Sequence, residues 1–181
     1  MNVARLAKKA KKGNKEALLQ LIMAEKDVYY RLAFTYTGNT HDAMDAMEEM
    51  IVRVYESIDQ LRNVEAFYSW SKTILVNCCR TLLHKQNKLV LLEDWNCAEG
   101  SIPGHALTSD PYIRSDQQMD IRQLLLHLNE HQKEAIQLKY FHDLDYQTIA
   151  DMTQVPLGTV KSRVFQGLKK LRDLYRGDVD E

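Results

Sequence analysis

The chain has 181 residues and a formal net charge of −1, and 45% of its residues are hydrophobic, far above the range of disordered chains. No stretch approaches the roughly 20 apolar residues that a membrane-spanning helix needs, and residues 1–15 are basic but lack the apolar segment of a signal peptide. We therefore expect a globular protein that stays in the cytoplasm and does not insert into a membrane. With seven Gly, three Pro and abundant Ala, Leu, Met, Lys, Glu and Gln, helices are favoured over a sheet.

Apolar residues recur at helical spacing over residues 14–88. Asn14 is the expected N-cap of the first helix, and Gly38-Asn39 is expected to end the second. We expect Thr40 to be the N-cap of the third helix.

The polar residues 59–64 predict a loop, and a fourth helix is expected over residues 65–88. Phe67 and Trp70 fall on the apolar side of this helix and are expected to belong to the core. An N-terminal helical bundle is therefore predicted over residues 1–88.

Helical periodicity is missing over residues 89–116, where most of the central Gly and Pro lie. Residues 86–118 hold two Lys or Arg against five Asp or Glu. A structureless stretch of this length is improbable inside one compact domain, so we interpret residues 89–116 as an acidic interdomain linker.

Helical periodicity returns in the last third of the chain and predicts helices over residues 119–127, 130–141, 145–153 and 156–175. They define a second helical domain over residues 117–176, followed by an acidic tail at 177–181. The predicted fold class is therefore all-α, with two small helical domains joined by a flexible linker.

Residues 145–171 read DYQTIADMTQVPLGTVKSRVFQGLKKL, which is typical of a helix-turn-helix. The small Ala150 lets two helices approach closely, and Pro156 suits the first turn of a helix because its missing N–H costs nothing there. Gln154 stands at the turn position that Gly often fills, where a positive φ carries a modest penalty. The small core between the two helices is expected to contain Ile149, Val155, Val160 and Val164.

The second helix of this pair is basic, and concentrated positive charge is a footprint of nucleic-acid binding. Arg engages guanine, Gln engages adenine, and Lys and Ser contact phosphates. The alternative is a helical hairpin that only packs and leaves its lysines in solvent. The residues expected to contact DNA are Thr159, Lys161, Ser162, Arg163, Gln166, Lys169 and Lys170.

No pattern in the chain predicts catalysis or a cofactor. Cys78, Cys79 and Cys97 form no CxxC pair and are expected to be buried, reduced thiols. The six His are scattered, no zinc-ligand set can be argued, and no GxxxxGK[ST] loop occurs. We expect a non-catalytic protein without a metal site or cofactor.

Two segments carry a resemblance to one family. The run LNEHQKEAIQLKYFHDLDYQTIADMTQVPLGTVKSRVFQGLKKLRDLY resembles region 4 of the extracytoplasmic-function group of bacterial sigma factors, and RLAFTYTGNTHDAMDAMEEMIVRVYESIDQLRNVEAFYSWSKTILVNCCRTLL resembles region 2. Both occur in the family's order and together cover about four-fifths of the chain. The resemblance implies a transcription initiation factor, often used in stress responses and held by an anti-sigma factor.

The resemblance also implies partners and sites for the N-terminal domain. Such factors bind the β and β′ subunits of core RNA polymerase, and the matching positions here are Asp45, Glu48, Glu49 and Arg53. The family commonly has Gln where Glu48 stands. The loop at 59–64 and the following helix correspond to the segment that opens the minus-ten element of promoter DNA, and single strands favour aromatic faces and cationic grooves. The implied minus-ten residues are Arg62, Asn63, Lys72, Asn77 and Arg80.

The resemblance assigns the minus-thirty-five element to the helix-turn-helix and places the linker in the polymerase cleft. Basic residues often stand in the family where this chain has Gln166 and Leu168. Fewer phosphate contacts predict that the affinity for DNA depends less steeply on salt concentration.

Two other classes of function stay open at this stage. A conventional regulator would bind DNA without polymerase, but residues 1–88 show no alternating strand–helix pattern of a receiver domain. An interaction protein, such as a degenerate sigma-like antagonist, is the other alternative. Binding to core polymerase discriminates between a sigma factor and a conventional regulator.

Overall fold

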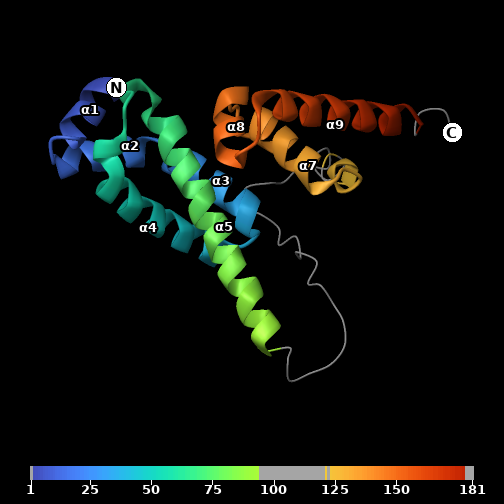
Figure 1. Cartoon of the computed structure of the whole chain (residues 1–181), viewed down its shortest axis with the longest axis horizontal. Coiled ribbons are helices and arrows are strands. Elements are labelled where there is room, and N and C mark those ends of the chain that lie inside the picture. The colour runs from blue at the N-terminus through green and yellow to red at the C-terminus, as the bar shows by residue number, and fades with distance from the viewer. Residues whose placement is uncertain (1, 94–120, 122, 178–181) are drawn as a thin grey trace. The chain divides into compact units, whose positions relative to one another are not determined.

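The computed structural model describes residues 2–93, 121 and 123–177, with side chains placed for 2–86, 121 and 123–175. The chain divides into two compact units, Met1–Thr108 and Ser109–Glu181. Every regular element in the described residues is helical, which confirms the predicted all-α class (Figure 1). Within these residues, no helix has the length and apolar character needed to cross a membrane. Nearly all of the predicted linker and most of the acidic tail lie outside the described residues.

The first unit is a helical bundle in which the long helix α5 packs against α3 and α4 (Figure 1). Helix α1 packs on α2 and beside the short turn η2. The elements are α1 (Val3–Ala10), α2 (Lys15–Ala24), α3 (Lys26–Thr37), α4 (Thr40–Ser57), the 3₁₀ turns η1 (Ile58–Gln60) and η2 (Val64–Ala66), and α5 (Phe67–Glu93).

Asparagine side chains begin three of these helices. The Oδ1 atoms of Asn2, Asn14 and Asn39 accept hydrogen bonds from the backbone N–H three residues later, at 2.9, 2.7 and 2.8 Å. The expected cap at Thr40 was wrong, because Asn39 has the extended backbone of an N-cap and Thr40 is already helical. Gly38 ends α3 as expected, with a left-handed φ of 72°.

The core of the first unit is built around large side chains that are fully buried. Phe67 is fully buried as predicted, whereas Trp70 is half-buried. The Tyr29 hydroxyl is buried with a hydrogen bond of 2.7 Å to the Ser71 hydroxyl, and burial raises its pKa. The core includes Tyr29, Leu32, Met50, Val54, Phe67 and Leu75.

Cys78 and Cys79 are buried, free thiols in α5, as the sequence predicted. Burial raises the pKa of Cys79 to about 12, so the thiol does not ionise near neutral pH. Cys97 lies outside the described residues.

Three elements of the first unit differ from their predictions. Helix α1 was not predicted, although Asn2 and the spacing of Leu6 and Ala10 carry its signal. The predicted loop at 59–64 overlaps two 3₁₀ turns, which are too short to produce a periodic pattern. Helix α5 begins two residues after the predicted start and continues to Glu93, five residues into the predicted linker.

The second unit contains the helix-turn-helix. A helical segment at 123–126 precedes α7 (Glu130–Ile136), which continues into the single π-helical turn η4 (Gln137–Phe141). Helices α8 (Tyr146–Thr153) and α9 (Leu157–Gly177) follow. The helices predicted over 145–153 and 156–175 are confirmed to within two residues at each end.

The turn between α8 and α9 has the conformation that the sequence left open. Gln154 adopts the left-handed region, with φ 54° and ψ 39°. Asp145 caps α8 by accepting hydrogen bonds from the Thr148 N–H at 2.9 Å and hydroxyl at 2.6 Å, which lowers the pKa of Asp145. The predicted core is confirmed for Ile149, Val160 and Val164, which are buried, while Val155 is half-buried.

Helix α9 also packs against α7, and a glycine sets the distance between them. A Cβ placed on Gly167 would lie 2.6 Å from Ile136 Cδ1 and 3.4 Å from Gln132 Cβ. Ile136 is itself buried, so its side chain has little space to move aside. By contrast, a Cβ on Gly158 in the same helix would meet nothing within 4 Å.

The two glycines of α9 give a matched stability test. We expect Gly158→Ala to raise the free energy of unfolding by up to about 1 kcal/mol, because Ala is the better helix former. We expect Gly167→Ala to lower it by about 1–3 kcal/mol, because overpacking outweighs that gain. Thermal unfolding of the full chain measures both, and an equal effect at the two positions would contradict the close α7–α9 contact.

Candidate nucleic-acid and protein interfaces

Helix α9 buries one stripe of side chains and exposes the rest. Val160, Val164 and Gly167 face the neighbouring helices. No acidic residue occurs between Pro156 and Arg172, so the exposed surface is cationic over its first four turns. The exposed members of the predicted DNA-contacting set are Lys161, Ser162, Gln166, Lys169 and Lys170.

Two members of that set lie closer to the core. Thr159 and Arg163 are half-buried because they flank the buried stripe of Val160 and Val164. Arg163 has no carboxylate within 4.0 Å among the described residues, so its guanidinium is available to an external acceptor.

Phe165, which was not among the predicted DNA-contacting residues, is 69% exposed in the middle of α9. It lies four residues after Lys161 and four before Lys169, on the same side of the helix. This four-residue spacing from two lysines is the sequence signal that could have identified Phe165 as a member of the exposed face. An apolar side chain on a recognition helix can contact the methyl group of thymine.

In the first unit, the outer face of α4 combines charge with exposed apolar surface. Asp45, Glu48 and Glu49 are exposed there. Arg53 donates to Glu49 at 2.7 Å, and this hydrogen bond raises the pKa of Arg53. Such a mixed surface suits a charged, partly apolar protein partner. The exposed apolar side chains of α4 are Met44, Ile51, Val52 and Tyr55.

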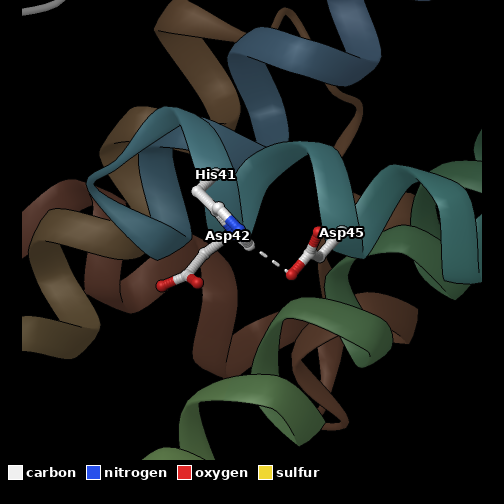
Figure 2. Close-up of side chains that lie close together, drawn as sticks. All are labelled: His41, Asp42 and Asp45. Carbon is white, nitrogen blue, oxygen red and sulfur yellow. Dashed lines mark ion pairs between the residues drawn. The ribbon is translucent and has the colours of Figure 1, made fainter.

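At the start of α4, His41, Asp42 and Asp45 lie close enough to resemble a metal site (Figure 2). His41 Nδ1 is 3.2 Å from Asp45 Oδ2, and both side chains are largely exposed. The two oxygens of Asp42 accept hydrogen bonds from Asn39 at 2.7 Å and Gln86 at 3.1 Å. Since these contacts already use the Asp42 carboxylate at a helix N-terminus, where the macrodipole disfavours cations, the cluster is explained without a metal.

Most of the residues predicted to contact the minus-ten strand lie at or near the surface. Arg62 and Asn63 are exposed between η1 and η2, where the Asn63 side chain caps η2 through the Glu65 N–H at 3.0 Å. Asn77 and Arg80 are half-buried, one turn apart on α5, and the Arg80 guanidinium lies 5.7 Å from the centre of the Tyr36 ring.

Lys72 has a different environment from the other four. Its ammonium lies 2.8 Å from Glu25 Oε2, and its side chain is 12% exposed. This ion pair joins α5 to the junction of α2 and α3. Lys72 is therefore engaged in an ion pair within the unit.

Comparison with known families matches both units. Residues 21–89 match sigma-70 region 2, and residues 118–171 match sigma-70 region 4. The chain is 34% identical over 164 residues to RNA polymerase sigma factor SigV of Bacillus subtilis strain 168, covering 91% of this chain and 94% of that protein. This chain belongs to the RNA polymerase sigma factors.

Two further likenesses place the sigma factor within its group and fold. It is 27% identical to the ECF RNA polymerase sigma factor SigW of the same Bacillus strain, covering 97% of this chain and 98% of that protein. The fold resembles sigma factor RpoE of Bartonella quintana, solved with the anti-sigma factor NepR, at a TM-score of 0.66 and 23% identity, covering 87% and 95% of the two chains. The chain is a member of the extracytoplasmic-function group, whose function is transcription initiation.

The two basic residues near the start of α9 are expected to act differently. We expect Arg163→Ala to weaken use of a preferred promoter by about 1–3 kcal/mol and to relax the preference at one base position. We expect Lys161→Ala to weaken DNA binding on all sequences alike. It should also reduce the slope of log affinity against log salt concentration by about 1. Transcription from promoters with single base changes upstream measures both, and an unchanged base preference in Arg163→Ala would remove that residue from base recognition.

Proposed function

We propose that this sigma factor binds core RNA polymerase through the outer face of α4, directs it to a subset of promoters and assists promoter opening without catalysing a reaction itself. It acts in the cytosol, where RNA polymerase transcribes the chromosome. Its contacts to unpaired bases lower the free energy needed to open the promoter duplex. The observation that carries the proposal is that one chain holds region 2 and region 4 in order and exposes the basic face of α9.

The surface proposed for the minus-thirty-five element is the exposed face of α9. Lys161, Lys169 and Lys170 are placed to contact phosphates, and Arg163 and Gln166 have the chemistry to read bases. Phe165 adds an apolar group that fits a thymine methyl. Because Gln166 and Leu168 carry no charge, fewer phosphates are neutralised and the salt dependence is shallower.

The surface proposed for the minus-ten strand is formed by Arg62, Asn63, Asn77 and Arg80. Arg62 and Asn63 are exposed on the segment between the 3₁₀ turns, where unpaired bases can approach backbone and side chain together. Arg80 already lies over an aromatic ring, so its guanidinium is oriented before any strand binds. Phe67 is excluded from stacking because it is fully buried.

We further propose control by an anti-sigma factor. The fold is shared with a sigma factor solved with such a partner, and the exposed apolar side chains of α4 offer a surface that an inhibitor and polymerase would compete for. A conventional regulator is not favoured, because the described part of the first unit is a helical bundle and not an α/β receiver.

Reconstitution tests the proposed function directly. The full chain is mixed with core polymerase and a library of upstream sequences, and the start sites that fire are sequenced. We expect a narrow set of promoters that share two elements and depend on the added chain. Transcription that does not depend on the added chain would reject a sigma function. So would a chain that binds duplex DNA but does not associate with core polymerase.

The α4 surface gives a separate prediction. We expect the double variant Glu49→Ala, Arg53→Ala to weaken association with core polymerase at least about ten-fold, or about 1.4 kcal/mol. The control Asp27→Ala, Arg31→Ala removes one acid and one base from exposed positions on α3. Titration of labelled chain with core polymerase measures both variants, and equal affinity would exclude this pair from the interface.

A further inference from the structure

Helix α1 presents a cationic stripe that no assigned site explains. The first 15 residues hold six Lys or Arg and no Asp or Glu. Helix α1 lies before residue 21, where the match to sigma-70 region 2 begins. Its function is therefore not covered by that match. The α1 stripe consists of Arg5, Lys8 and Lys9.

Packing forces the α1 stripe outward. Ala7 and Ala10 are buried, and Leu6 is half-buried, so this side of α1 faces the rest of the unit. Arg5, Lys8 and Lys9 have the spacing i, i+3 and i+4, which places them on one face. All three are exposed, and among the described residues none has a carboxylate within 4.0 Å.

Helix stability does not account for this charge. Lys8 and Lys9 lie in the last turn of α1, where cations stabilise the macrodipole. Arg5 lies in the first turn, which contains no acidic residue, and a cation there opposes the macrodipole. The stripe therefore includes a charge that is unfavourable for the helix itself.

The contacts of α1 place the helix beside the segment proposed to open DNA. The Lys11 ammonium donates to the backbone carbonyl of Leu61 at 2.6 Å, directly before Arg62 and Asn63. Helix α1 also packs against η2, directly after those two residues. The helix therefore lies against both ends of this short exposed segment.

We infer that the α1 stripe is a further DNA-contacting surface, which binds backbone phosphates of promoter DNA beside the Arg62–Asn63 segment. The inference rests on the proposed function for the passage of DNA along that segment. Three cations on one face, none with a carboxylate within 4.0 Å among the described residues, suit a polyanion. The position of α1 against the segment that holds exposed Arg62 favours DNA over an acidic protein. Lys11 is a positioning residue, which ties the helix to the segment.

The test uses full-length chain in holoenzyme, on a promoter recovered from the upstream library. The variants are Arg5→Gln and the double variant Lys8→Gln, Lys9→Gln. The matched control is Lys26→Gln, Arg31→Gln, which removes two exposed cations of the same unit from α3. The readouts are the slope of log affinity against log salt for the promoter complex, the affinity for core polymerase and the thermal unfolding of each chain.

We expect the double variant to reduce the salt slope by about 1.4–1.8, since each lost phosphate contact contributes about 0.7 on single strands and about 0.9 on duplex. Arg5→Gln should reduce it by about half as much while leaving thermal stability equal or higher, a combination that a purely structural role would not produce. Affinity for core polymerase should stay unchanged, as should the salt slope of the control.

Unchanged salt slopes in both α1 variants would overturn the inference. So would slopes that fall equally in the control, or α1 variants that lose affinity for core polymerase while their salt slopes stay unchanged. Because the unmodified chain must first direct polymerase to the promoter, failure of that step would reject the proposed function instead. The two failures are therefore distinguishable.

Discussion

The two-sided character of α9 is the constraint on which the DNA-binding surface depends. Val160 and Val164 are buried between helices, and Gly167 meets Ile136 too closely for any side chain larger than hydrogen. A helix held this tightly along one stripe cannot rotate without exposing apolar atoms and driving backbone into a neighbour. Its cationic face therefore stays outward, and the close α7–α9 contact fixes the direction in which that face points within the unit.

In the first unit, packing likewise determines which face of a helix is exposed. Burial of Met50 and Val54 leaves the opposite face of α4 exposed, with charged and apolar groups interleaved. Inside the unit, two contacts engage polar groups: Lys72 with Glu25 across α5 and the α2–α3 junction, and Tyr29 with Ser71. Such contacts reduce the availability of a group to an external partner, even where its residue type alone suggests DNA binding.

Much of the fold was predictable because local signals agree with the tertiary structure. Asn14, Gly38 and the helix-turn-helix pattern predicted element ends to within a few residues, since caps and hydrophobic periodicity are local properties. The missed cap at Asn39 shows the limit, because two adjacent polar residues compete for one position and backbone geometry selects between them. Helix α1 was not predicted, because a helix of eight residues whose buried side is formed by small Ala7 and Ala10 gives a short and weak apolar pattern.

By itself, the sequence determined the helical class, the order of the two domains, the family and the residue types of each surface, because these follow from periodicity, composition and motif. Only the tertiary structure decided which of those residues are available. It buried Phe67, engaged Lys72, exposed Phe165 and held α1 against the segment at Arg62 and Asn63. The physical reason is that availability depends on contacts between residues far apart in the chain, such as Lys11 with Leu61, which no local pattern contains.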